Sequence, residues 1–336
     1  MSRYTDNGTI IMDRPPSVVA YGSAAGRMEA EGPLGSCFDY VSEDSSFGER
    51  TWEKAESRLQ QHALEQALIR GGLSEGEISF MFAGDLQSQC TASVYSMRDS
   101  GVRFFGVYGA CSTMAECMAL AAVFADSGAG NLCAALASSH FCTAERQFRT
   151  PEDYGGQRTP TAQWTATASG CVIIGEHSAP PYITAVTPGR ITDLGINDAN
   201  NMGAAMAPAA YDTISSHFEA TGTSPEDYDL ILTGDLGCVG SEILRDLFLH
   251  DGISLGDRHN DCGMMIFDRD RQDVHAGGSG CGCSASVLCG HILGRVKSGG
   301  LKNVLFCATG ALMSTTLLQQ GESIPGIAHC VQIRGE

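Results

Sequence analysis

Residues 108–116 read YGACSTMAE and place Cys111 in a tight turn, directly before a segment with a helical pattern. The preceding residues 102–108 form an apolar run of strand length, so the chain passes here from a strand to a helix. A thiol at a helix N-terminus lies near the positive end of the helix dipole and near free backbone N–H groups, which favour the thiolate. We therefore expect Cys111 to line a pocket and to have a lowered pKa, although a buried thiol with no chemistry is the alternative in a chain with fourteen cysteines.

Two segments of the chain are repeated in the same order. Residues 74–88, SEGEISFMFAGDLQS, match residues 224–238, SPEDYDLILTGDLGC, at an offset of 150. Residues 131–139, NLCAALASS, match residues 303–311, NVLFCATGA, at an offset of 172, which also relates Cys111 to Cys283. The sequence therefore predicts two duplicated halves of strands and helices, residues 1–175 and 176–336, that form one compact unit.

The repeated halves carry apolar runs that predict buried strands. Both faces of such strands are covered when the run is continuously apolar rather than alternating. The expected strands are residues 78–82, 102–108, 132–137, 230–233 and 303–308. One helix is expected over residues 52–70, and a second from about Pro208, a residue suited to a first helical turn, to just before Gly222.

The composition excludes several classes of function. The formal net charge is −18, so the surface should repel nucleic acid and anionic lipid. The first residues lack the apolar stretch of a signal peptide, and the longest uncharged runs are too rich in Gly, Ser and Asn for a transmembrane helix. Without a secretory signal, the cysteines are expected to be free thiols in the cytoplasm. Their spacing does not fit a zinc site, so we expect neither a metal nor a cofactor.

A duplicated α/β chain with Gly-Ala-Cys-Ser at a strand-to-helix turn resembles the thiolase superfamily. That resemblance implies a five-layer αβαβα fold built from the two halves. Nine motifs in order make the chain similar to the stage V sporulation protein AD family of spore-forming bacteria: EGPLG (31–35), GACST (109–113), TAERQFR (143–149), YGGQ (154–157), MAPAAYDTI (206–214), ILTGDLGCVGS (231–241), HNDCG (259–263), AGGSGC (276–281) and SIPGIAH (323–329).

The resemblance to condensing enzymes implies an incomplete catalytic set. Cys111 matches the acyl-accepting cysteine, and His259 in RHNDCG resembles the histidine of ketoacyl synthase III, with a loop histidine of no chemical role as the alternative. The stretch that should supply an asparagine, residues 275–285, contains none, and GHILG at 290–294 comes too late to replace it. Cys307 aligns with the second cysteine of thiolases, but its glycine loop is eroded, and a buried strand-end cysteine is the favoured alternative.

The polar stretch 138–160 concentrates basic side chains in an acidic chain. Long loops after buried strands commonly carry function, and arginine pairs well with carboxylates. The predicted ligand-binding residues are Cys111, Ser139, His140, Arg146, Arg149, His259 and Asn260, with Arg146 the first choice. The alternative is that Glu145, Arg146 and Asp153 form structural ion pairs at a dimer interface.

The resemblance implies a protein without enzymatic activity that binds dipicolinic acid (pyridine-2,6-dicarboxylate), alone or as its calcium complex, and supports its transport into the developing spore. It further implies partners among the membrane proteins of the stage V sporulation A operon and a peripheral position at the inner forespore membrane. A homodimer joined through residues 131–139 is expected. The alternatives are an acyl-CoA-dependent condensing enzyme that uses Cys111 and His259, and a scaffold with a vestigial pocket.

Overall fold

The structure is a computed structural model that describes residues 3–149 and 158–336, and Asp153 lies outside these residues. In the described residues one sheet of thirteen strands has a main path of ten strands, which divides into two five-stranded halves, here called the first and the second sheet. The first contains, in spatial order, β3 (Ser17–Ala25), β9 (Ala168–Gly175), β7 (Leu132–Ser139), β5 (Phe80–Gly84) and β6 (Arg103–Gly106). The second contains β10 (Tyr182–Pro188), β15 (Gly326–Arg334), β14 (Asn303–Ala311), β11 (Leu230–Thr233) and β12 (His259–Asp261).

The two sheets have the same strand order and the same pairing directions. In each, the first three strands pair antiparallel and the last two join in parallel. β5 matches β11 and β7 matches β14, as the two sequence repeats predict, and the five expected strands are all present within a few residues. The halves meet where β3 pairs with β10 at Ser17 and Tyr182. The predicted boundary at residue 175 falls at the end of β9.

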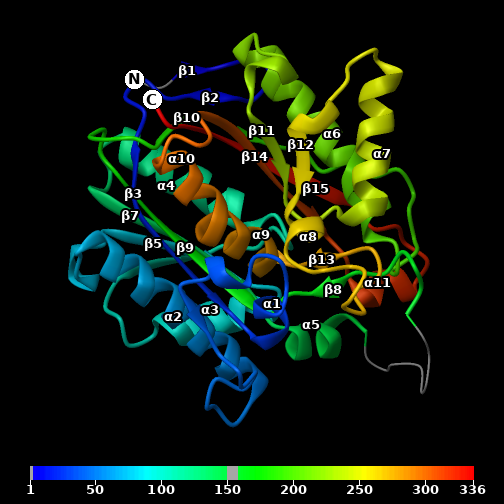
Figure 1. Ribbon diagram of the computed structural model, residues 1–336, viewed down its shortest axis with the longest axis horizontal. Coiled ribbons are helices and arrows are strands. Elements are labelled where there is room, and N and C mark those ends of the chain that lie inside the picture. The colour runs from blue at the N-terminus through cyan, green and yellow to red at the C-terminus, as the bar shows by residue number, and fades with distance from the viewer. Residues whose placement is uncertain (1–2, 150–157) are drawn as a thin grey trace.

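Helices complete a five-layer arrangement (Figure 1). α2 (Trp52–Gly71) and α3 (Thr91–Met97) lie on the outer side of the first sheet, and α6 (Met202–Thr221) and α7 (Gly237–His250) on the outer side of the second. Between the sheets lie α4 (Thr113–Asp126) and α9 (Cys281–Val287), and α4 contacts strands of both sheets. This central layer explains why α4 is apolar nearly all round, with Met114, Met118 and Ala122 fully buried. The thiolase-like fold class predicted from the sequence is confirmed.

Shorter elements connect these layers. They are β1 (Arg3–Tyr4), β2 (Ile10–Ile11), β4 (Tyr40–Val41), β8 (Trp164–Thr165), β13 (Gly278–Ser279), α1 (Arg27–Ala30), α5 (Phe141–Phe148), α8 (Cys262–Met265), α10 (Leu293–Lys297) and α11 (Thr315–Gln319). Among the described residues, no helix is long and apolar enough to cross a membrane. All fourteen cysteines, each of them described, are free thiols.

The second long helix begins earlier than the sequence predicted. α6 starts at Met202, with Asn201 as its N-cap, so Pro208 lies inside the helix rather than in its first turn. The side chain of Asn201 accepts a hydrogen bond from the backbone N–H of Ala204 and supplies the start signal that we assigned to proline. The first long helix agrees with its prediction, since α2 is capped by Thr51 and ends at Gly72 in the left-handed conformation.

The predicted dimer strand is not an edge strand. β7, which covers residues 132–139, pairs with β5 on one side and β9 on the other, so both of its edges are already occupied. In the described part of the chain, the edge of the first sheet is β6. Large apolar side chains are exposed on and beside this edge, on β6, on α3 and in the turn that follows β6: Val94, Tyr95, Phe105 and Tyr108. Edge-to-edge joining through residues 131–139 is therefore wrong, and the end strands of the described sheet are β6 and β12.

We expect a two-fold dimer joined through β6, because an apolar strand edge is a pairing surface that symmetry closes. Multi-angle light scattering at low micromolar concentration should give about twice the chain mass of 35.4 kDa. Phe105→Lys should give the monomer mass, since it places a charge at the contact. Leu249→Lys, at an exposed position on α7, should leave the dimer intact. A monomeric parent protein would contradict the prediction.

Candidate functional site

Cys111 occupies a sharp turn between β6 and α4. Ala110 has a positive φ of 50°, which turns the chain so that Cys111 directly precedes Ser112, the N-cap of α4. Gly310 of β14 packs against this turn so closely that a Cβ atom there would lie 2.4 Å from the carbonyl oxygen of Gly109. The position therefore requires glycine. The Cys111 side chain is buried, and the turn brings it to the boundary between the two halves of the chain.

A buried carboxylate from the second half lies beside Cys111. Asp235 follows β11, and it accepts hydrogen bonds from Ser279 Oγ (3.1 Å), from the backbone N–H of Gly280 (2.8 Å) and from Thr309 Oγ1 (2.9 Å). Ser279 Oγ in turn lies 4.0 Å from the sulfur of Cys111. The group that reaches the thiol from the end of β11 is thus a carboxylate and not a basic histidine.

The expectation of a lowered pKa for Cys111 is wrong. Burial raises the pKa of the Cys111 thiol well above its ordinary value, and the negative charge of Asp235 raises it further. Burial also raises the pKa of Asp235, while its hydrogen-bond donors act in the opposite direction. A thiolate beside a buried carboxylate would be destabilised by like charge, which outweighs the helix dipole here. The thiol is therefore protonated and weakly nucleophilic.

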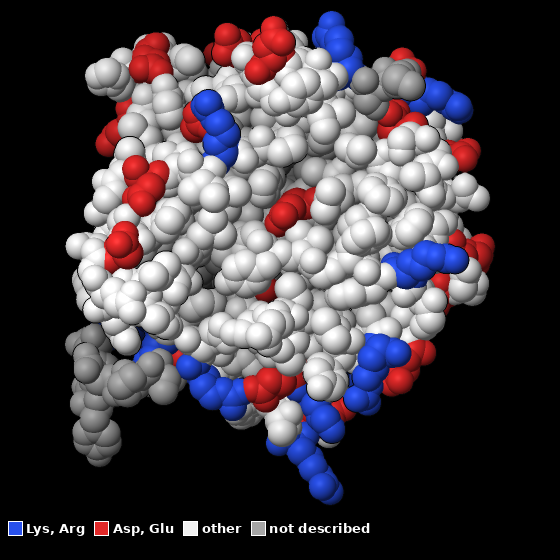
Figure 2. Space-filling model, turned by 180° about the vertical axis from the view of Figure 1, so that it is seen from behind, with Lys and Arg blue, Asp and Glu red and all other residues white. Residues whose placement is uncertain are grey.

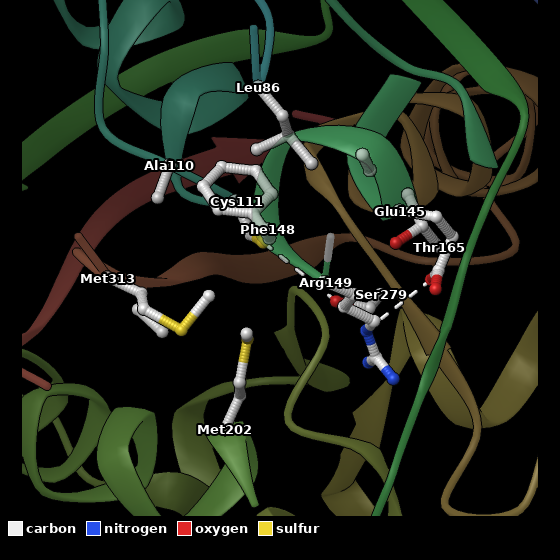
Figure 3. A pocket seen from close by; sticks show the side chains of 12 residues that line it. Leu86, Ala110, Cys111, Glu145, Phe148, Arg149, Thr165, Met202, Ser279 and Met313 are labelled. Carbon is white, nitrogen blue, oxygen red and sulfur yellow. Dashed lines mark hydrogen bonds and ion pairs between the residues drawn. The ribbon is translucent and has the colours of Figure 1, made fainter. Parts of the chain in front are cut away.

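The cavity in front of Cys111 has an apolar wall and a charged rim (Figure 3). Leu86, Phe148, Met202 and Met313 surround the thiol, and Arg149, Glu145, Thr165 and Ser279 lie at one side. The free volume is about 40 Å³, well below the ~300 Å³ or more of typical ligand pockets. Two of the wall residues are methionines, whose unbranched side chains change rotamer readily. A ligand larger than a few atoms therefore enters only if this wall moves.

Two guanidinium groups converge on one carboxylate at the rim. Glu145 forms ion pairs with Arg149 (3.4 Å) and Arg158 (2.9 Å), and the backbone oxygen of Gln163 accepts a hydrogen bond from Arg158 (3.0 Å). Arg158 also lies over the ring of Trp164, 4.8 Å from its centroid. Of these three charged groups, Arg149 and Glu145 line the cavity, whereas Arg158 pairs with Glu145 without lining it. A guanidinium group at the rim can pair with an anion.

His259 does not belong to this site. It lies on β12 and lines a separate groove with Arg245, Ser254 and Asn260, whereas Cys111 lines the cavity between the halves. Arg245 donates a hydrogen bond to His259 Nδ1 (3.2 Å), so Nε2 carries the proton and donates to Thr233 Oγ1 (3.0 Å). Burial, and then the charge of Arg245, lowers the pKa of His259 to about 3. His259 is neutral at physiological pH and attracts no carboxylate.

Two residues of the stretch 138–149 act as structural groups rather than ligand contacts. His140 caps α5 through Nδ1, donates through Nε2 to the backbone oxygen of Ser45 (2.8 Å), and has its pKa lowered by burial. Ser139 donates to the backbone oxygen of Ala166 (2.7 Å) and is fully buried. Neither side chain lines the Cys111 cavity.

Arg146, the first choice for ligand binding, forms an ion pair with Glu53 of α2 and does not line the cavity. It lies one turn before the cavity residue Arg149 on the face of α5 that meets α2. Arg146 therefore does not have the cavity position predicted for it. Its ion pair is made with Glu53 of the same chain, and the alternative of ion pairs at a dimer interface stays a prediction. Of the predicted ligand residues, only Cys111 and Arg149 line the cavity.

The remaining sequence candidates lie elsewhere. Asn260 accepts a hydrogen bond from the backbone N–H of Asp261 (2.8 Å) and lines the groove of His259. Cys307 is fully buried within β14 and lies opposite Cys330 of β15, which agrees with the interpretation of a buried thiol. His291 of the GHILG motif lies in a π-helical turn between α9 and α10, outside the cavity. Within the described residues, no cluster of His, Cys, Asp and Glu could hold a metal ion.

Neither Asp235 nor Ser279 was predicted from the sequence. Asp235 belongs to the repeated Gly-Asp-Leu motif that revealed the duplication, but its equivalent Asp85 lies in a different environment, so the repeat gave no sign of a pocket role. Ser279 is brought to Cys111 because β13 pairs with β8 in a two-stranded sheet that no sequence pattern predicted. The sequence signal that could have indicated a pocket role for Asp235 is its position just after the apolar strand β11.

Comparisons with known proteins agree with this geometry. The sequence profile of the family described as stage V sporulation protein AD matches residues 6–334. The curated stage V sporulation protein AD of Bacillus subtilis (strain 168) is 45% identical over 329 residues, which cover 98% of this chain and 97% of that protein.

Solved structures of condensing enzymes share the fold at low sequence identity. The 3-oxoacyl-[acyl-carrier-protein] synthase III of Aquifex aeolicus VF5 matches with a TM-score of 0.61 and 13% identity, covering 95% of this chain and 99% of that chain. A variant of OleA from Xanthomonas campestris matches with a TM-score of 0.62 and 13% identity, covering 96% of this chain and 99% of that chain.

Because its pKa is raised, Cys111 should be alkylated by iodoacetamide at pH 8 more slowly than the partly exposed Cys142, as peptide mass spectrometry would measure. Asp235→Asn removes the neighbouring negative charge and should increase the rate at Cys111 severalfold. Asp85→Asn, at the matching position of the first half, should leave that rate unchanged. Faster alkylation of Cys111 than of Cys142 in the parent protein would contradict the prediction.

Proposed function

This chain belongs to the stage V sporulation protein AD family and has a role in sporulation, and we propose that it fulfils this role by binding dipicolinate in the Cys111 cavity. The protein then acts as a binding protein rather than an enzyme, and it supports the transport of dipicolinate into the developing spore. The ligand is bound either alone or as its calcium complex.

The observation that carries the proposal is the guanidinium group of Arg149 at the rim of the cavity. Dipicolinate has two carboxylates, and moving them from water into a partly dry pocket is costly unless cations compensate. Arg149 pairs there with Glu145, and Arg158, which does not line the cavity, pairs with the same carboxylate. A guanidinium carries five N–H donors in a planar fork, so Arg149 can bind a ligand carboxylate beside Glu145.

The apolar wall supports the aromatic part of the ligand. Phe148, Leu86, Met202 and Met313 offer aromatic, aliphatic and thioether surfaces that suit a pyridine ring. Met202 and Met313 change rotamer to open the wall, and their contacts with the pyridine ring then replace the contacts that they make in the closed cavity. At the inner end of the cavity, Ser279 lines the wall, and its hydroxyl binds the second carboxylate by turning away from Asp235, to which it now donates.

The alternative function is an acyl-CoA-dependent condensing enzyme, favoured by the position of Cys111 and by the fold shared with synthases. Acyl transfer needs an activated thiolate and a nearby base. Asp235 disfavours the thiolate, and His259 lies in another groove. These observations favour the binding function over acyl transfer. A scaffold with a vestigial pocket would have the same geometry, so ligand binding must be measured.

We further propose that the protein is held at the inner forespore membrane by membrane proteins of the stage V sporulation A operon. A net charge of −18 disfavours contact with anionic lipid headgroups, so protein contacts must provide the attachment. The protein is then peripheral, with the cavity available to dipicolinate on the cytoplasmic side.

Calorimetric titration with dipicolinate should show binding by the parent protein, and Arg149→Ala should weaken it by about 1.5–3 kcal/mol, the scale of a lost charged hydrogen bond. Arg146→Ala, on the same helix but paired with Glu53, and His259→Ala, in the other groove, should bind as the parent does. No heat and no thermal shift with millimolar dipicolinate would leave the scaffold as the better account. A stable acyl adduct on Cys111 after incubation with acetyl-CoA, followed by turnover, would favour the condensing enzyme.

A further inference from the structure

A second buried carboxylate lies behind the cavity, on the side of α2. Glu56 is fully buried and accepts three hydrogen bonds: from Gln87 Nε2 (2.7 Å), from Thr143 Oγ1 (2.7 Å) and from Ser138 Oγ (2.9 Å). The three donors belong to the turn after β5, to α5 and to the end of β7. One side chain of α2 therefore holds three separate segments of the first half.

Two of these segments carry the cavity wall. Gln87 directly follows Leu86, and Thr143 directly precedes Ala144 and Glu145, and Leu86, Ala144 and Glu145 all line the cavity. α5 also ends at Phe148 and Arg149, the ring and the guanidinium at the rim. A helix of eight residues has little stability of its own, so its position depends on contacts such as this one.

We propose that Glu56 is the positioning residue of the dipicolinate site: from α2 it fixes α5 and the turn after β5, and with them the rim arginine and the apolar wall. This inference rests on the proposed function, since it assigns a role within that site. Glu56 does not line the cavity and acts through Thr143 and Gln87.

The Glu56 contact extends to a second carboxylate through Gln60. The side-chain amide of Gln60 donates to the hydroxyls of Ser138 (2.8 Å) and Ser93 (2.9 Å). The Ser138 hydroxyl donates to Glu56, and the Ser93 hydroxyl donates to Asp85 (2.6 Å). The titratable groups that interact with Glu56 are Asp85 after β5 and Cys281 of α9. Of these, Asp85 faces it as a like charge.

The protonation state of Glu56 gives the proposal a distinctive signature. Burial, and then the charge of Asp85, raises the pKa of Glu56 to about 8. A raised pKa means that the folded site favours the protonated carboxyl, because the ionised form is desolvated and faces Asp85. Exposure of Glu56 to water returns its pKa toward the ordinary value, so opening of this contact releases a proton and becomes easier as the pH rises toward 8. α5 and the turn after β5 should therefore be held less firmly at pH 9 than at pH 6.5, which a contact serving only to fill space would not produce.

The test compares dipicolinate titrations of the parent and Glu56→Gln at pH 6.5 and pH 9. Glutamine resembles the protonated carboxyl, so the two proteins should bind alike at pH 6.5. At pH 9 the parent should bind about tenfold more weakly than at pH 6.5, since one pKa unit corresponds to a factor of ten, and the variant should bind as it does at pH 6.5. Thr143→Val removes one of the donors and should weaken binding at both pH values. Thr213→Val, a buried helical threonine of α6 that donates only to backbone oxygens, should bind as the parent does.

Hydrogen exchange measured by mass spectrometry gives a second readout that needs no ligand. After correction for intrinsic rates, peptides covering residues 141–149 should be less protected at pH 9 than at pH 6.5 in the parent, and equally protected at the two pH values in Glu56→Gln. Peptides from α6 should not differ between the two proteins. If the parent binds no dipicolinate, the proposed function fails while the exchange result still decides the role of Glu56. Equal binding at pH 9 and equal exchange in parent and variant would overturn the inference.

Discussion

The contact between the buried carboxylate of Asp235 and the turn that carries Cys111 determines what this fold can do. Asp235 is fixed by hydrogen bonds from β13, from the start of α9 and from β14, and it faces the thiol across the boundary of the two halves. The same turn in a condensing enzyme would serve an activated thiolate. Here a negative charge beside the sulfur keeps the thiol protonated, so the position can contact a ligand but does not favour attack on one.

The opposite end of the cavity has the opposite electrostatic character. Arg149 and Arg158 converge on Glu145, which places two guanidinium groups together in an acidic chain. An uncharged thiol at one end and an anion-attracting rim at the other suit recognition of a small carboxylate better than group transfer. Figure 2 shows that the Lys and Arg side chains on the face opposite to that of Figure 1 lie mainly toward its margin, while acidic side chains also occur near its centre.

Local sequence patterns predicted the framework, and long-range pairing decided the site. The repeats at offsets of 150 and 172 correctly predicted that β5 is equivalent to β11 and β7 to β14. They could do so because an apolar strand and the residues at its end are contiguous in the sequence. The position of Cys111 followed from the same local pattern. By contrast, His259 and Arg146 were assigned from residue type, and neither periodicity nor spacing shows that β12 lies at the far edge of its sheet or that Arg146 meets Glu53. Ser279 reaches Cys111 only through the pairing of β13 with β8.

The most direct test of the account is a crystal structure of the protein soaked with dipicolinate. We predict a planar ring between Phe148 and Met313, with Met202 and Met313 in new rotamers, one carboxylate on Arg149, and no covalent bond to Cys111. Density for the ligand in the groove of Arg245 and His259, or a cavity that stays closed at saturating dipicolinate, would contradict the assignment of this cavity as the binding site.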